Sequence, residues 1–365
     1  MRIALAHDYL REYGGAERVL EALHEIYPEA PVYTAFVDKK SLGIHYKKFK
    51  KWNIKTTWMA DIPFIKKLYS PLRFLAPHAF ADLDLSKFDL VISSSNAYYA
   101  KAVKVRNGKH LCYCHTPPRS LYGYSTSTSW KKNIFVRIFG ELINFYLRQI
   151  DFKIAQKVDV FIANSEETKR RIEKFYRRDS VVVFPPVSVK DAMDPGLRRD
   201  DSGGEYYLYV NRLALAKHPE IAVQVCNKLN LPLKVVGTGK MLNQLKEMVG
   251  NTVEILGSVD DKKLNNLYSA AKALIYPVED EDFGMIPVEA MMHGVPVIAH
   301  ASGGPLETVL DKKTGIFFED LNFKGLEEAI KKFEKQKFDK NKIKKHAGKF
   351  SKKEFERKIK KLVLF

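Results

Sequence analysis

The sequence predicts an α/β protein with two domains, each built around a parallel sheet. The chain has 365 residues, more than a single hydrophobic core usually holds. Short runs rich in valine and isoleucine alternate with amphipathic helical stretches in both halves, and such runs are typical of strands covered by helices on both faces. A segment rich in proline, glycine, aspartate and arginine separates the halves. We therefore expect domains at 1–189 and 205–349, joined by a linker at 190–204.

Strand-like stretches occur throughout both halves. In the first half they are 2–7, 89–95, 109–115, 158–165 and 180–186. In the second half they are 206–212, 232–239, 252–258, 272–278, 295–300 and 314–319. The terminal segment 350–365 has apolar residues at helical spacing and predicts a last helix. Ligands of open α/β sheets bind at the carboxyl ends of the strands, so the loops that follow the strands are the places to look for a site.

Composition excludes several classes of protein. Hydrophobic residues make up 45% of the chain and charged residues 28%, which is typical of a globular protein. Three cysteines argue against a disulfide framework and for a reducing compartment, and Cys112 and Cys114 lack the further ligands that a metal site needs. The segment 133–150 is amphipathic and contains charges, so it is not expected to span a membrane, and the N-terminus is typical of a first strand. These features predict a cytoplasmic protein.

The net charge of +18 is concentrated in two regions. Residues 39–73 contain ten lysines and arginines against one acid, Asp61, and residues 324–365 contain sixteen lysines and arginines against six acids. In the first region aromatic and leucine side chains lie between the cations. That mixture favours an anionic membrane surface, although nucleic acid is an alternative partner.

Two strand-end loops of the first half carry candidate site residues. The first strand ends at His7, is followed by Asp8 and Tyr9, and leads to Gly14-Gly15 before a helix. Two glycines allow a bulky anion to approach the backbone, and a helix start offers N–H groups. In "CHTPPRSLYGY", His115 stands at a strand end, two prolines fix the chain, and Arg119 follows. His115 could bind a sugar hydroxyl or transfer a proton.

The second half has three such loops. In "YVNRLALAKHPE", Arg212 and Lys217 could neutralise a diphosphate. In "EDFGMIPVEAM", Glu281 lies in a loop and Glu289 within the following helix, so the two carboxylates can reach one cleft at different depths. The D-x-D pattern around Glu281 is disfavoured as a metal site. In "HASGGPLETVLD", Gly303-Gly304 predicts an anion cradle at a helix start.

Several motifs together resemble a known family. "YVNRLALAKHPE", "VVGTGK", "EDFGMIPVEAMMHGVPVIAHASGGPLETV" and "TGIFF" resemble, in order and spacing, the donor domain of glycosyltransferase family 4. "GGAER" and "CHTPPR" resemble the acceptor domain of its bacterial mannosyltransferase branch, which serves O-antigen, lipopolysaccharide and exopolysaccharide synthesis. The resemblance implies the GT-B fold, in which two Rossmann-like domains face each other across a cleft and the last helix, 350–365, packs back on the first domain.

The resemblance also implies roles for individual residues. Arg212 and Lys217 would stabilise the leaving diphosphate, Glu281 would contact the donor sugar and Glu289 the ribose. His115 would lie near the reacting centre. The remaining residues implied on the donor side are Gly14, Gly15, Gly237, Gly257, Val259, Phe283, Gly284, Met285 and Ile286. Those expected on the acceptor side are His7, Asp8, Tyr9 and Arg119.

The expected reaction is transfer of a hexose, best fitted by mannose from GDP-mannose, to a lipid-linked or polysaccharide acceptor. The family implies retention at the anomeric carbon and no obligatory metal or other cofactor. No carboxylate suggests itself as a nucleophile, so our hypothesis is front-face attack through an ion pair, which trapping of a glycosyl-enzyme adduct would disprove. With residues 39–73 against an anionic membrane, the enzyme would be peripheral on the inner face of the cytoplasmic membrane.

Other functions remain open at this point. A UDP-sugar could replace GDP-mannose, and a nucleotide-sugar epimerase of the same fold is possible, although "GGAER" and "CHTPPR" weigh against it. A basic protein that binds nucleic acid would fit the net charge. The acidic residues at the strand ends weigh against it, because they would repel the phosphates of the nucleic acid. A nicotinamide dehydrogenase is disfavoured because no G-x-G-x-x-G follows the first strand of either half.

Overall fold

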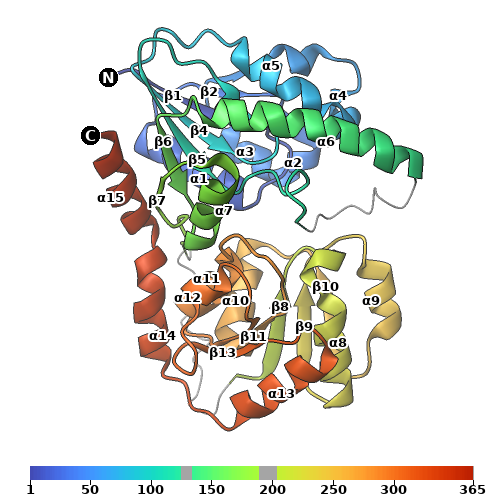
Figure 1. Ribbon diagram of the computed structural model, residues 1–365. Coiled ribbons are helices and arrows are strands. Elements are labelled where there is room, and N and C mark those ends of the chain that lie inside the picture. Colours follow the sequence, from blue (N-terminus) through green and yellow to red (C-terminus); the bar gives the residue numbers. More distant parts are fainter. Residues whose placement is uncertain (125–133, 189–203, 365) are drawn as a thin grey trace. The chain divides into compact units, whose positions relative to one another are not determined.

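The computed structural model describes residues 1–124, 134–188 and 204–364 (Figure 1). The chain divides into two compact units. Unit 1 contains Met1–Pro186 and Lys352–Phe365, and unit 2 contains Val187–Ser351. The linker expected at 190–204 falls almost entirely outside the described residues. Each unit has its own parallel sheet and is described separately below.

The sheet of unit 1 has the order β3-β2-β1-β4-β5-β6-β7, and every neighbouring pair is parallel. Its strands are β1 Ile3–His7, β2 Val32–Thr34, β3 Ile54–Thr56, β4 Leu90–Ser95, β5 Lys109–Cys114, β6 Val160–Ala163 and β7 Ser180–Val182. The sequence predicts five of these seven strands. It misses β2 and β3, which have three residues each, because runs that short show too little period to be recognised.

Helices cover both faces of this sheet. They are α1 Gly15–Ile26, α2 Lys39–Leu42, α3 Tyr46–Phe49, α4 Ile65–Leu68, α5 Ala76–Ala81, α6 Ile134–Ala155, α7 Glu166–Tyr176 and α15 Lys352–Val363, with 3₁₀ turns η1 Gly43–His45, η2 Trp58–Asp61, η3 Pro71–Leu75 and η4 Ala100–Ala102. Alternate residues of a strand face opposite sides, so Leu5 packs with α1 and α15 while Ala4 packs with α5 and α6. The final helix α15 buries Phe355 and Ile359 on the face of the sheet to which Leu5 and α1 belong.

The sheet of unit 2 has the order β10-β9-β8-β11-β12-β13 and is also parallel throughout. Its strands are β8 Tyr206–Val210, β9 Leu233–Val236, β10 Val253–Gly257, β11 Ala271–Tyr276, β12 Val297–His300 and β13 Gly315–Phe318, all within or next to predicted stretches. Its helices are α8 Pro219–Lys228, α9 Leu242–Met248, α10 Asp261–Ala270, α11 Met285–Met292, α12 Pro305–Thr308, α13 Phe323–Glu334 and α14 Lys340–Ala347, with 3₁₀ turns η6 Leu215–Lys217 and η7 Gly348–Phe350. Apolar residues of α8 and α13 form a core with the strands.

In both units the strand order reverses once. The reversal lies between β1 and β4 in unit 1 and between β8 and β11 in unit 2. At such a switch point the loops after the two strands leave toward opposite faces of the sheet, which opens a crevice at their carboxyl ends. Both units therefore present a place for a ligand, at the ends of the four strands named.

Candidate functional site

The switch point of unit 2 brings together the charged residues that the sequence singles out. Lys217 closes the loop that follows β8, and Glu281 lies in the loop that follows β11. The Lys217 ammonium forms an ion pair with Glu281 Oε2, and the Tyr276 hydroxyl donates a hydrogen bond of 2.8 Å to the same oxygen. Both charged side chains are partly buried. One carboxylate is thus oriented by a cation and a phenol, with neither partner adjacent to it in the sequence.

Glu289 lies on α11, two turns beyond Glu281. It is buried and accepts a hydrogen bond of 3.1 Å from the hydroxyl of Tyr268. The helix begins after Gly284, whose φ of 83° lies in the left-handed region that a residue with a Cβ adopts only under strain. The structure places one glutamate in the loop and one inside the helix, as the sequence predicts. Their contact with a donor stays a prediction.

The expected anion cradle at Gly303-Gly304 is wrong for one of its two amides. Gly304 N–H donates a hydrogen bond of 2.7 Å to the carbonyl oxygen of Glu281 and is therefore not available to an anion. A Cβ on Gly303 would come within 2.3 Å of that same oxygen. These glycines let the loop after β12 pass against the loop that carries Glu281, and the α12 helix after them has only four residues. Their role in the structure is to support Glu281.

The loops after β8, β9 and β10 lie against one another in the same unit. Gly237 N–H donates to the carbonyl oxygen of Gly257 at 2.8 Å, and a Cβ on Gly237 would come within 1.8 Å of the carbonyl oxygen of Asn211. Arg212 follows Asn211 and is exposed, while Val259 follows Gly257 at the turn into α10 and is half-buried. Gly237, Gly257 and Val259, which are predicted on the donor side, therefore lie beside the loop that carries the predicted diphosphate-binding cations.

Three further donor-side residues open α11. Phe283 is buried, and its ring packs edge-on against Phe350 of the same unit at 5.7 Å between centroids. Met285 and Ile286 form the first helical positions and are half-buried. The Phe283 side chain is thus committed to packing, so any contact with a ligand would come from its backbone.

The switch point of unit 1 joins two histidines through one hydroxyl. The Ser94 Oγ atom, on β4, lies 2.8 Å from His115 Nε2 and 3.1 Å from His7 Nδ1. The other ring nitrogen of His7 is 3.5 Å from Glu17 on α1, and Glu17 also accepts from Gly14 N–H at 2.8 Å. A hydroxyl has one proton, so Ser94 donates to one ring and accepts from the other. The tautomer of each imidazole is therefore coupled to that of the other.

Burial keeps His115 uncharged. Desolvation, together with repulsion from His7, lowers the pKa of His115 to about 3, and desolvation lowers the pKa of His110 to about 4. His110 lies on β5, with its Nε2 atom 2.8 Å from Ser93 Oγ. At neutral pH His115 can therefore donate or accept a hydrogen bond to a sugar hydroxyl without adding charge to the site.

These two histidines predict a pH-dependent stability of unit 1. The folded unit holds both rings neutral, so below pH about 6.5 the unfolded chain binds protons that the folded unit does not. The free energy of unfolding should fall as the pH decreases from about 6.5 to 5, by up to about 1.4 kcal/mol per pH unit for each ring. Urea denaturation followed by tryptophan fluorescence measures this, since all three tryptophans lie in 1–186.

The matched variants are His115→Gln and His78→Gln. The first variant should reduce the dependence of the unfolding free energy on pH by about the contribution of one imidazole. The second variant, at an exposed position, should leave this dependence unchanged. An unaltered slope in His115→Gln would contradict the neutral imidazole.

The other residues expected on the acceptor side differ in their surroundings. Asp8 is buried and accepts from the backbone N–H groups of Asn96, Tyr98 and Ala100, each at 2.9 Å. Tyr9 stacks on the ring of Phe36 within an aromatic cluster. Asp8 therefore organises the loop after β4, and Tyr9 packs the loop after β1. Arg119 is half-buried in the turn after the two prolines, and its role on the acceptor side stays a prediction.

The structure also places Ser94, Glu17, Tyr268 and Tyr276 around the candidate residues, and none of them is singled out by the sequence. Ser94 stands in "VISSS", where a run of serines at the end of a buried strand is a usable signal, because buried hydroxyls need partners. Glu17 is in the first helical turn, where it is indistinguishable from an ordinary cap. The two tyrosines lie in apolar segments and are indistinguishable from core residues in the sequence.

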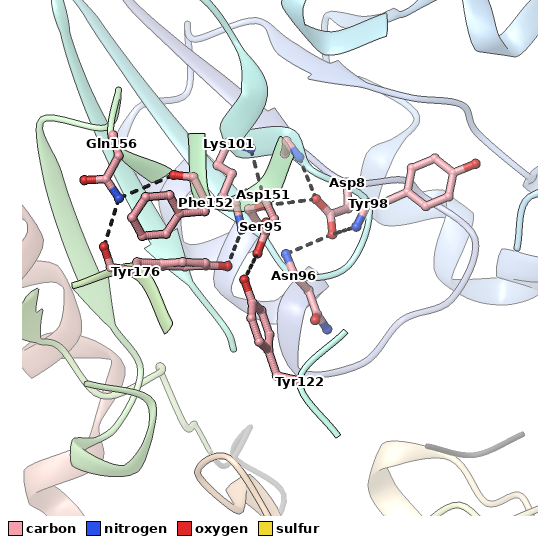
Figure 2. A network of polar contacts seen from close by, with 11 residues as sticks. Asp8, Ser95, Asn96, Tyr98, Lys101, Tyr122, Asp151, Phe152, Gln156 and Tyr176 are labelled. Atoms are coloured by element: carbon pink, nitrogen blue, oxygen red, sulfur yellow. Dashed lines mark hydrogen bonds and ion pairs between the residues drawn. The ribbon is translucent and has the colours of Figure 1, made fainter. Parts of the chain in front are cut away.

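A second buried network in unit 1 supports the same loops (Figure 2). Lys101, on η4, forms an ion pair of 2.7 Å with Asp151 of α6, and both side chains are at most 1% exposed. Tyr122 donates to the other carboxylate oxygen at 2.8 Å, and Lys101 donates to the hydroxyl of Tyr176 at 2.6 Å. The ammonium and the carboxylate thus join η4, α6, α7 and the turn after His115, which fixes the loop that positions this histidine.

Three findings concern the cysteines, possible metal sites and possible membrane-spanning helices. All three cysteines are buried and free of disulfides. Within 1–124, 134–188 and 204–364, no group of three or more histidine, cysteine or carboxylate residues is placed to hold a metal ion, and independence from metals stays a prediction. None of the described helices is long and apolar enough to cross a membrane.

Comparisons with solved structures show the fold. The lipopolysaccharide outer core galactosyltransferase WaaB matches with a TM-score of 0.70 and 16% identity over 100% of this chain and 99% of the other. Sucrose-phosphate synthase from Thermosynechococcus elongatus matches with a TM-score of 0.72 and 18% identity over 100% and 98%. These proteins share the α/β architecture of two Rossmann-like domains, which confirms the predicted fold class.

Comparisons of sequence show the family. Alpha-1,3/1,6-mannosyltransferase ALG2 of Candida glabrata is 24% identical over 85% of this chain and 78% of its own length. A human GDP-Man:Man(3)GlcNAc(2)-PP-Dol alpha-1,2-mannosyltransferase is 26% identical over 84% and 73%. The family model for glycosyltransferase family 4 matches residues 13–189, and the model for group 1 glycosyl transferases matches residues 198–353. Since the two models together cover nearly the whole sequence, the chain is a glycosyltransferase and belongs to family 4, with the GT-B fold.

Proposed function

We propose that this glycosyltransferase moves mannose from GDP-mannose to a lipid-linked glycan. The observation that carries the proposal is the Glu281 carboxylate, oriented by Lys217 and Tyr276 at the switch point of unit 2. A carboxylate accepts hydrogen bonds from sugar hydroxyls, and a lysine beside it supplies positive charge for a phosphate. The names of the human and yeast relatives, both mannosyltransferases, support the choice of sugar.

The proposed chemistry needs charge stabilisation at the leaving group. As the bond between the anomeric carbon and the diphosphate oxygen breaks, negative charge develops on the diphosphate. Lys217, with Arg212 on the same loop, neutralises it, and a well-placed donor in such a site contributes about 3–4 kcal/mol. The buried Glu289 binds the ribose, and backbone amides at the start of α11 lie against the sugar.

We further propose retention of configuration without a metal. The acceptor hydroxyl bonds to the anomeric carbon on the face that the diphosphate leaves, and its proton passes to the departing diphosphate oxygen. His115, held neutral by burial, binds the transferred sugar without placing a second cation beside the oxocarbenium-like carbon. Product anomers are distinguishable by NMR, so inversion would contradict this part of the proposal.

The lipid-linked acceptor implies work at a membrane surface. The human relative's name specifies a PP-Dol acceptor, which supports this choice of substrate class. In 39–73 the side chains of Ile44, Trp58 and Phe64 are exposed between lysines, a mixture that suits anionic headgroups. We place the enzyme on the inner face of the cytoplasmic membrane, where nucleotide sugars are available.

The test is a panel of nucleotide sugars with wild-type protein and the Glu281→Ala variant. GDP-mannose should raise the melting temperature and be hydrolysed slowly, and the variant should lose most of both effects while remaining folded. The panel includes UDP-glucose, because HepE of Anabaena, 17% identical with a TM-score of 0.69, is solved with UDP and glucose.

The possible outcomes separate the hypotheses. A shift with a UDP-sugar alone would contradict the GDP-mannose donor and keep the transferase. Conversion of a nucleotide sugar to its epimer would identify an epimerase. No shift with any nucleotide sugar, in protein shown to be folded, would count against the donor site at Glu281.

A further inference from the structure

Helix α6 has an apolar stripe on each of two opposite sides. Its inner side packs Ile143, Leu147 and Ile154 on the core of unit 1. The same side carries Asn144, which accepts from Arg73 at 2.6 Å, and the buried Asp151. These contacts fix the rotation of the helix on the unit, so its outer side is held in one orientation.

The outer side is apolar but exposed. Ile138, Leu142, Phe145, Tyr146 and Phe152 are between 38% and 64% exposed. At 3.6 residues per turn they fall within an arc of about 120° roughly opposite Leu147, and this arc also contains the exposed Gln149 and Lys153. With a rise of about 1.5 Å per residue, the stripe is roughly 20 Å long. An exposed surface of this size that is mostly apolar, on a fixed helix, normally marks a contact with another apolar phase.

Charge distinguishes the kinds of partner. Arg137 lies beside the stripe and Lys153 lies within its last turn, and both are exposed. Through its contacts with η3 and α5, including His78 Nε2 at 3.3 Å from the Tyr146 hydroxyl, α6 is joined to the basic segment 39–73. On that segment Phe64 is 72% exposed and Lys66 and Lys67 follow it. Two copies of a chain with a net charge of +18 repel each other, whereas an anionic surface attracts this one.

We propose that the outer side of α6 lies flat in the headgroup region of an anionic lipid bilayer. Ile138, Leu142, Phe145 and Phe152 enter the boundary of the acyl chains, and Tyr146 keeps its contact with His78. Arg137 and Lys153 extend their charged ends toward lipid phosphates. No described helix is suited to crossing a bilayer, so α6 lies along the surface. This inference deepens the proposed function, on which it rests for the choice of a lipid surface, and assigns membrane contact to residues outside 39–73.

The test measures binding of full-length protein to vesicles of phosphatidylcholine with and without phosphatidylglycerol. Wild type should bind the anionic vesicles and leave part of its binding intact at high salt, because apolar insertion is not screened. The double variant Leu142→Gln/Phe145→Gln should bind at least about tenfold more weakly, since two inserted side chains are lost. The control, Val181→Gln/Leu364→Gln, removes two exposed apolar side chains elsewhere in unit 1 and should bind as wild type does.

Two results would overturn the inference. One is equal vesicle binding by wild type and the α6 variant. The other is a dimer of wild type in sedimentation velocity that becomes a monomer in the α6 variant, since a second copy would then cover the stripe. Nucleotide-sugar shifts measured without vesicles separate this inference from the proposed function. The α6 variant should retain these nucleotide-sugar shifts. If wild type shows no such shift, the result counts against the proposed donor and not against the inference about α6.

Discussion

Replacing Lys101 by methionine is expected to destabilise unit 1 by about 3–5 kcal/mol, because it leaves the Asp151 carboxylate buried without its cation. The two side chains are at most 1% exposed, so water cannot take the place of the missing partner. Burial opposes the charge on Lys101, yet attraction to Asp151 prevails and the pKa of Lys101 is raised. Lys101 is therefore a cation in the folded unit.

The measurement is urea denaturation followed by tryptophan fluorescence, which reports on unit 1. Lys104→Met removes an exposed lysine three residues away and should change the unfolding free energy by no more than about 0.5 kcal/mol. The double variant Lys101→Met/Asp151→Leu removes both charges, and it should recover much of the loss, as apolar replacements of buried pairs often do. Additive losses in the double variant would show that the two charges act independently.

Loss of the Lys101–Asp151 pair should also disturb the loop that positions His115. Tyr122 and Tyr176 contact this pair, and Tyr122 belongs to the turn that follows His115. Loss of the pair loosens η4, α6 and this turn together, because one ammonium and one carboxylate join them (Figure 2). In this unit a buried charge pair holds an irregular loop, because an apolar core offers no directional contact for that purpose.

The sequence predicts strands wherever an apolar run is long enough to show its period. It therefore predicts β1 and β11 and the loops after them, and it misses β2 and β3 with three residues each. Because candidate residues at strand ends depend on those runs, Glu281, Lys217 and His115 can be placed after their strands from the sequence alone. Their partners cannot, since Ser94 meets His115 only through strand pairing.

Paired glycines also show what cannot be predicted from the sequence alone. A pair of glycines before a helix predicts an anion site, yet the same pair is needed wherever two loops approach closely. At Gly303-Gly304 the second requirement holds, because the Gly304 N–H is used by Glu281 and a Cβ would collide with that loop. The sequence contains the glycines but does not show which backbone lies beside them. Only the tertiary structure distinguishes an anion site from a close approach of two loops.

Glu281→Ala and Lys217→Ala are each expected to lower kcat/KM for transfer by about 10²–10³-fold, the size of one lost electrostatic contact in a water-poor site. Each removes one member of the ion pair after β8 and β11. The double variant should fall short of the sum of the two losses by about 1–3 kcal/mol, because residues in contact are coupled. Steady-state kinetics with the donor identified by the nucleotide-sugar panel provides the measurement.

Two further variants separate chemistry from folding. Glu279→Ala removes an exposed acid two residues from Glu281 and should keep wild-type kinetics. Tyr276→Phe keeps the ring but removes the hydroxyl that holds Glu281, so it should produce a smaller loss than Glu281→Ala. If the losses of Glu281→Ala and Lys217→Ala simply add, each side chain acts on the donor by itself. Coupling instead means that the carboxylate aligns the ammonium before the leaving-group charge develops, which is the preorganisation that makes such a contact effective.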